Sequence, residues 1–222
     1  NVLNIITLAK KRFEEPAADE RQFFSIGCHS HNEMHLLPEI LRQMADSCPM
    51  LYPVFQVVPF RHLYQLLDEE TVDVIIAFQE KSSKKTEGIY KELARVRITG
   101  VLPANHPLAE KELLDEDALR TQRLLLLDPQ RCPDSLNAVQ QELASGRAVS
   151  DLLMCGSADA CVMLAKAGFG IAVQPDFPSL RDPALAYIPI KGTEPLSYGA
   201  YYKTASGKPL LKDFLLLCKK SL

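Results

Sequence analysis

The sequence contains no tryptophan, and aromatic residues make up only 7% of it. A protein surface that stacks on nucleic-acid bases needs aromatic side chains, so their scarcity disfavours this kind of binding. Positive charge is also in short supply, because 25 Lys and Arg residues face 28 Asp and Glu residues, for a net charge of −3. Nucleic-acid-binding domains carry a basic face. The sequence therefore indicates that this chain is not itself the DNA- or RNA-binding part of a protein.

Long apolar runs and paired cysteines are missing as well. No run approaches the roughly 20 residues that a membrane-spanning helix needs, and no signal peptide is recognisable. The six cysteines contain no Cys-x-x-Cys pair, and several lie in apolar runs, where a free Cys acts as a small hydrophobe. We therefore expect reduced core thiols in a cytoplasmic protein that does not contact the membrane. The chain starts with Asn1 instead of Met, as a fragment or trimmed chain would.

The rest of the composition is that of a globular protein of one or two domains: 222 residues, 47% hydrophobic and 24% charged. Predicted strands at 23–28, 54–58 and 72–78 alternate with predicted helices. This order predicts an α/β sheet with right-handed crossovers. A further long strand is predicted at 93–102, and its apolar pattern shifts at Gly100, as expected of a strand that passes between two lobes.

The stretch from Cys155 to Pro175 predicts a helix that leads into a buried strand. Ser157 is suited to cap the helix and Asp159 to sit in its first turn, where the helix dipole favours negative charge. Gly168 is suited to end it in a left-handed conformation. Apolar residues cover most of the helix, which predicts burial on more than one side. Its free N-terminus could hold an anion.

Five short motifs recur in this order along the chain: Ile26-Gly27, Leu36-Leu37-Pro38-Glu39, Val72-Asp73-Val74-Ile75-Ile76, Asn105-His106-Pro107-Leu108-Ala109 and Ala167-Gly168-Phe169-Gly170-Ile171-Ala172-Val173-Gln174-Pro175. No single motif is specific, but their order and spacing resemble the effector-binding domain of LysR-type transcriptional regulators. The resemblance covers Phe23 to Leu222. Residues 1–13 resemble the end of the linker helix that joins this domain to the family's DNA-binding domain.

The resemblance implies an α/β fold of two Rossmann-like lobes joined by two crossing strands, like the type 2 periplasmic binding proteins. The implied domains are the linker at 1–21, a first lobe at 22–97 plus 186–222, and a second lobe at 98–185. A small-molecule effector would bind between the lobes of a homodimer or homotetramer. DNA would be bound by a helix-turn-helix domain that this sequence does not contain. No cofactor, metal or catalytic activity is implied.

Open α/β sheets bind ligands beyond the carboxyl ends of their strands, so the residues that follow each strand are the candidates for effector binding. These are His29, Ser30, His31, Asn32, Phe60, Arg61, Gln79, Asp128, Gln130 and Ser157. The family usually has Ser or Thr at the position of His31 and often Ser at that of His29, so the sequence departs from the family here. Arg61 could pair with a carboxylate through two hydrogen bonds, which makes a carboxylate effector a hypothesis.

Three other functions are alternatives to effector binding in a LysR-type regulator. His29-x-His31-x-x-x-His35 resembles the metal-binding pattern of metal-dependent hydrolases. Cys28 or Ser30 could act as a nucleophile if a base were placed beside it. The solute receptor of a transporter would share the two-lobed fold, although the missing signal peptide and the six cysteines argue against it.

Overall fold

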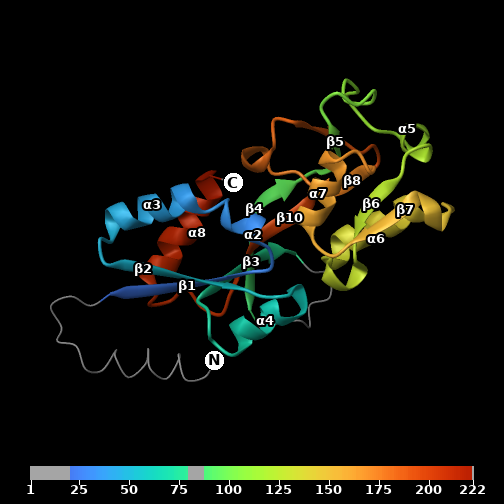
Figure 1. Cartoon of the computed structure of the whole chain (residues 1–222). Coiled ribbons are helices and arrows are strands. Elements are labelled where there is room, and N and C mark those ends of the chain that lie inside the picture. The colour runs from blue at the N-terminus through green and yellow to red at the C-terminus, as the bar shows by residue number, and fades with distance from the viewer. Residues whose placement is uncertain (1–20, 80–87, 222) are drawn as a thin grey trace.

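The computed structural model describes residues 21–79 and 88–221, which form two mixed five-stranded sheets with helices on their faces (Figure 1). The predicted linker helix at 1–13 lies outside the described residues. In the described part of the chain, no helix combines the length and the apolar character that crossing a bilayer requires. All six cysteines are free thiols, and five of them are buried.

The first sheet has the strand order β2-β1-β3-β10-β4. Its strands are β1 (Gln22–Cys28), β2 (Leu51–Val57), β3 (Val74–Phe78), β4 (Ile89–Val96) and β10 (Leu196–Tyr202). β1 runs parallel to β2 and β3, whereas β10 is antiparallel to β3 and β4. β3 is buried along its whole length, as its run of apolar residues predicts for a strand that is covered on both faces.

Helices on both faces provide that cover. On one face, α3 (Pro38–Ser47) packs beside α8 (Pro209–Ser221) and both contribute buried side chains to the core. On the other face, α4 (Phe60–Asp68) packs against β1 and β3. A separate four-residue helix, α2 (His31–Met34), precedes α3. Pro38 begins α3, where its missing N–H costs nothing, because the first helical position needs no N–H donor.

The second sheet has the order β7-β6-β8-β5-β9. Its strands are β5 (Ile98–Pro103), β6 (Leu124–Leu127), β7 (Leu152–Cys155), β8 (Ile171–Pro175) and β9 (Leu185–Pro189). α7 (Ala158–Lys166) covers one face, while α5 (Glu116–Arg120) and α6 (Asp134–Ala144) contribute to the core on the other. Short 3-10 turns complete this lobe: η1 (Pro129–Arg131), η2 (Val149–Asp151) and η3 (Pro178–Leu180).

The chain crosses between the sheets twice. β4 ends at Val96 in the first sheet and β5 starts at Ile98 in the second, and the chain returns from β9 to β10. The fold is therefore the expected pair of α/β lobes with two crossing strands. The single long strand predicted at 93–102 is in fact two strands that meet at Arg97. The pattern shift at Gly100 has another cause, since a Cβ there would collide with Leu114 and Ile171.

The domain boundaries at 97/98 and 185/186 stay a prediction. The sheets place β9 with the second lobe, although most of its residues lie beyond the expected boundary at 186.

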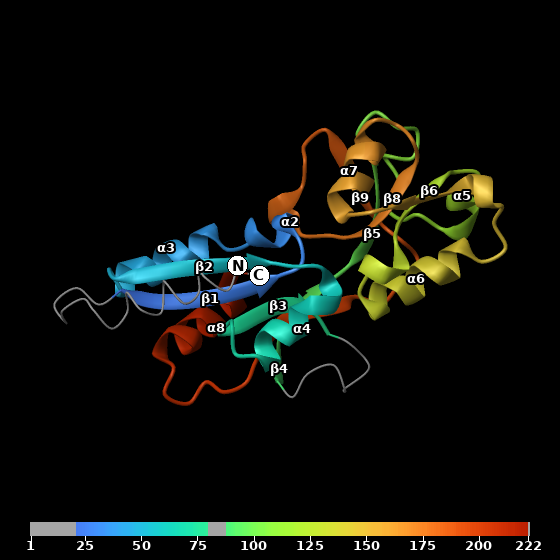
Figure 2. The same ribbon diagram turned by 60° about the horizontal axis from the view of Figure 1, so that its bottom comes forward.

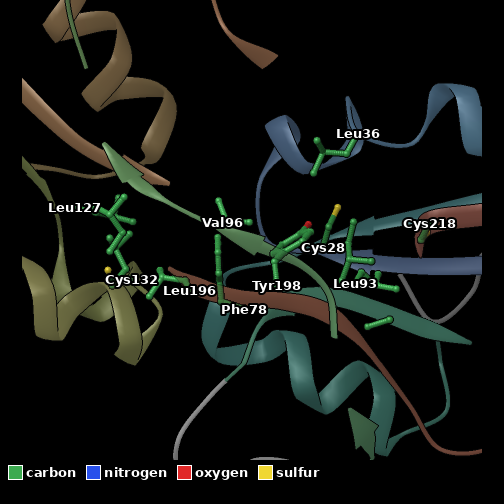
Figure 3. Packing of buried hydrophobic residues seen from close by; sticks show 14 of the residues in the cluster. Cys28, Leu36, Phe78, Leu93, Val96, Leu127, Cys132, Leu196, Tyr198 and Cys218 are labelled. Carbon is green, nitrogen blue, oxygen red and sulfur yellow. The ribbon is translucent and has the colours of Figure 1, made fainter. Parts of the chain in front are cut away.

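One apolar core continues through the crossing from lobe to lobe. In Figure 3, Leu127 and Cys132 of the second lobe lie on one side and Cys28 and Leu93 of the first lobe lie on the other, with Tyr198 between them. Buried contact in this region ties the lobes together through packing as well as through the covalent chain.

Three aromatic rings strengthen this junction. The ring of Phe177, which follows β8, lies 5.0 Å from the ring of Tyr198 and 6.2 Å from that of Phe78, measured between centroids. The rings of Phe78 and Tyr198 are 4.9 Å apart. Tilted and edge-on aromatic pairs at such distances stabilise a fold beyond the area that they bury.

Phe214 of α8 offers a test of the first lobe's core. It is fully buried and its ring lies 5.2 Å from that of Phe24 in β1. Phe214→Ala is expected to lower the free energy of unfolding by about 3–5 kcal/mol, because it removes apolar contacts and leaves a cavity. Leu216→Ala, on the exposed side of the same helix, is expected to stay within about 0.5 kcal/mol of the parent. Urea denaturation measures both, and equal losses would contradict this account of the core.

Candidate functional site

A cavity of about 380 Å³ lies between the two lobes. Most of its wall is apolar, and the large apolar side chains in it are Phe78, Leu127, Pro133, Leu136, Val162, Met163, Pro175, Phe177 and Leu180. The polar side chains in the wall are His29, Ser30, Asn32, Glu33, Asp159, Lys166, Gln174, Asp182 and Tyr187. A cavity of this size with a mostly apolar surface is typical of a small-molecule site.

Three of the residues predicted from the sequence line this cavity: His29, Ser30 and Asn32. They lie together because β1 ends at Cys28 and α2 begins at His31, so the turn between them points toward the second lobe. In Figure 2, α2 sits at the boundary between the lobes. Their role in binding stays a prediction.

The other predicted residues lie outside the cavity wall. His31, Gln79 and Gln130 are exposed, and Phe60 is buried in the core between α4 and the first sheet. The carboxylate of Asp128 accepts a hydrogen bond from the Gln130 backbone N–H at 2.9 Å and so caps η1.

The last two residues predicted from the sequence are Ser157 and Arg61. Ser157 caps α7 as predicted, because its hydroxyl accepts a hydrogen bond from the Ala160 N–H at 3.1 Å. The side chain of Arg61 lies outside the described part of the chain. The pairing of Arg61 with a carboxylate therefore stays a prediction.

The N-terminus of α2 is closed by a carboxylate of the chain itself. Ser30 accepts a hydrogen bond from the Glu33 N–H at 3.4 Å, and Glu33 reaches back in the reciprocal half of a capping box. Glu33 Oε2 accepts from the backbone N–H groups of His29, at 3.0 Å, and Ser30, at 3.3 Å. Glu33 is only 4% exposed, so these bonds replace the water that a buried carboxylate loses.

His29 adds a second, electrostatic partner for Glu33. Its Nδ1 lies 2.9 Å from Glu33 Oε2, and the contact is an ion pair when the imidazole is protonated. Burial disfavours the charged imidazole and lowers its pKa, but the carboxylates of Glu33 and Asp159 outweigh burial, so the pKa of His29 is raised. The ring also packs edge-on against Phe60 at 5.6 Å. His29 therefore tends to carry a positive charge against Glu33.

The groups behind Glu33 are neutral. Burial, with the Glu33 charge as a smaller cause, raises the pKa of the Cys28 thiol to about 12. The same two causes raise the pKa of Tyr198 well above its usual value. The Tyr198 hydroxyl and Glu33 Oε1 are buried without a hydrogen-bond partner in suitable geometry. Because the thiolate is the nucleophilic form, Cys28 is a poor candidate for covalent catalysis.

The second lobe presents α7 to the cavity. The side-chain amide of Asn32 in α2 donates a hydrogen bond to Asp159 in the first turn of α7, which joins the lobes across 127 residues of sequence. The predicted burial of α7 on more than one side is wrong, because only Cys161 and Ala165 are buried. Met163 is 57% exposed and lines the cavity. The apolar surface of α7 thus faces the cavity as well as the core.

Two further polar features of the second lobe lie in the wall. Lys166 Nζ lies 2.6 Å from Asp182 Oδ2 in an ion pair, and Asp182 Oδ1 accepts from the Ala184 N–H at 2.8 Å. Gln174 at the end of β8 is 5% exposed, and its side-chain amide lies beside the buried Cys161 thiol of α7.

The metal-like histidine pattern is not assembled. His29 faces Glu33, while His31 and His35 are exposed. Within residues 21–79 and 88–221, no group of three or more His, Cys, Asp or Glu side chains is placed to hold a metal ion.

Six polar residues of the wall were missed as site residues by reasoning from the sequence: Glu33, Asp159, Lys166, Gln174, Asp182 and Tyr187. Glu33 could have been found, because Ser30-x-x-Glu33 is the sequence signature of a capping box. Lys166, Gln174 and Asp182 carry no local signal, since only the packing of α7, β8 and the chain after η3 brings them to the cavity.

Comparisons with known proteins agree with this architecture. The family model described as LysR substrate binding domain matches residues 17–222. Among solved structures, the reduced form of OxyR is 22% identical, with 89% of this chain and 93% of that chain covered and a TM-score of 0.66. HinK, a LysR family transcriptional regulator from Pseudomonas aeruginosa, is 16% identical, with 99% and 77% covered and a TM-score of 0.73.

Full-length BenM is likewise 16% identical, with 99% of this chain and 73% of that chain covered and a TM-score of 0.71. No curated protein matches the chain by sequence. At these identities, the solved structures establish the fold, and the family model establishes the family.

The raised pKa of His29 predicts a pH dependence of stability. The ion pair with Glu33 contributes fully below the unfolded pKa of about 6.5 and is lost as pH rises through the higher folded pKa. The free energy of unfolding of the parent is therefore expected to fall, relative to that of His29→Gln, as pH rises above about 6.5. Urea denaturation between pH 6 and pH 9 measures the difference. His35→Gln, at an exposed histidine, should follow the parent, and a constant difference between parent and His29→Gln would refute the assignment.

Proposed function

The chain belongs to the LysR substrate-binding domain family, and we propose that the cavity between its lobes binds the small effector that controls the regulator. The observation that carries this proposal is that both lobes build the cavity wall. A ligand there contacts α2 of the first lobe and α7 of the second together. It therefore interacts differently with closed and open arrangements of the lobes, and only such a difference can shift a conformational equilibrium.

The contacts between the lobes support this coupling. Besides the two crossing strands, the contacts between the lobes include the Asn32–Asp159 hydrogen bond at the cavity and the packing of Phe177 on Phe78 and Tyr198. Asn32, Asp159, Phe78 and Phe177 also line the cavity. An effector would thus bind against the same side chains that hold the lobes together.

The wider role follows from the family. We propose that the domain acts in the cytoplasm as part of a homodimer or homotetramer, and that DNA is bound by a helix-turn-helix domain outside this sequence. The net charge of −3 accords with that division of labour. We assign no catalytic activity to the domain, in keeping with the neutral, buried Cys28 thiol.

Filling the cavity tests the proposal. Ala158, at the first position of α7, lines the cavity, so Ala158→Trp should occupy part of the ligand space. Metabolites that raise the melting temperature of the parent, as a ligand of the folded state must, are then titrated against this variant. The expected result is a loss of affinity of at least about ten-fold, or about 1.4 kcal/mol.

Ala167→Trp is the matched control, because Ala167 is exposed at the other end of the same helix and outside the cavity wall. It should bind as the parent does. Circular dichroism of each variant without ligand checks that the fold is kept. Equal affinities of Ala158→Trp and the parent would show that the ligand binds elsewhere.

A further inference from the structure

We propose that the effector is a small apolar molecule that carries an amine cation, and not a carboxylate. This inference rests on the proposed function, since it describes the ligand of the same cavity. Two observations support it: the position of the Glu33 carboxylate and the balance of charge in the cavity wall.

The first observation concerns the place where an anion would bind. A helix N-terminus offers backbone N–H groups that can hold a carboxylate or phosphate. Here Glu33 Oε2 already accepts from the N–H groups of His29 and Ser30. A ligand carboxylate at this turn would find those donors engaged and would face a buried like charge, which disfavours its ionised form.

The second observation is an excess of negative charge. Glu33, Asp159 and Asp182 line the cavity, whereas Lys166 and a protonated His29 supply the positive charges. Lys166 pairs with Asp182 at 2.6 Å and His29 lies 2.9 Å from Glu33, so these four charges balance. Asp159 accepts from the neutral amide of Asn32, which provides no countercharge. A cation on the ligand would supply one.

The remaining buried polar side chain of the wall is Gln174. Gln174 is 5% exposed, and its side-chain amide lies beside the buried Cys161 thiol. It therefore points into the second lobe and adds no polar requirement to the ligand.

The apolar part of the wall determines the size and shape of the ligand's apolar part. Between these polar groups lie Phe78, Leu136, Val162 and Phe177, which favour a flat or branched apolar body. The cavity of about 380 Å³ is near the lower end of the range for small-molecule sites. An arylalkylamine is a molecule of this kind.

Two matched sets of probes test the inference. Each holds one ring and varies one end group: tyramine, tyrosol and hydroxyphenylacetate, and then tryptamine, tryptophol and indoleacetate. Affinities are measured by ligand-observed NMR and calorimetry on the parent and on Ala158→Trp, which identifies binding in the cavity. The expected order of affinity is amine, then alcohol, then carboxylate.

Asp159→Asn is expected to weaken binding of the amines about five-fold, the effect of removing a partly exposed ion pair, while leaving the alcohols unchanged. Glu116→Gln, which removes an exposed carboxylate of the same lobe outside this cavity wall, is the control and should leave all affinities unchanged. Carboxylates that bind in the cavity as tightly as the amines would overturn the inference and leave the proposed function standing. The inference also fails if Asp159→Asn has no effect. If no probe of either set binds in the cavity, the result counts against both.

Discussion

The double passage of the chain between the two sheets is the constraint on which the rest of the structure depends. β4 runs into β5 within one residue, and β9 returns to β10, so the lobes are held side by side at a fixed edge. The rings of Phe78, Phe177 and Tyr198 pack at this junction. The cavity lies where the lobes diverge from it, with Phe78 and Phe177 in its wall. Any change in the angle between the lobes must therefore change the shape of the cavity.

Glu33 connects local folding with the chemistry of the site. As the third residue of α2 it completes a capping box, the kind of interaction that stabilises a short helix by about 1 kcal/mol. The same carboxylate holds His29 in an ion pair and occupies the donors at the cavity. A residue whose local role is to stabilise a helix end thus sets the electrostatic character of the binding surface. Because Glu33 already occupies the donors of this turn, the turn is not free to hold an anionic ligand.

Several local features could be read from the sequence because their causes lie within a few residues. Ser157 caps α7, Gly168 adopts a φ of +81° after it, and β8 follows as a buried strand. The errors arose where an apolar residue had two explanations. Met163 is one of the apolar residues whose number predicts a buried helix, but it lines the cavity, because a ligand site and a core both favour apolar side chains. The pattern shift at Gly100 predicts the crossing there, yet the missing side chain makes room for Leu114.

The sequence by itself determined the family and the alternation of strands and helices, and it selected the turn after β1, which lines the cavity, as a candidate for binding. These depend on short-range patterns: apolar periodicity, caps, and motifs in a fixed order. Only the tertiary structure decided which polar groups share the cavity, and therefore its charge. Asn32 and Asp159 meet across 127 residues, and Lys166 and Asp182 across 16. Such contacts form only when the lobes have folded and packed together, and no local sequence pattern indicates which distant residues will meet.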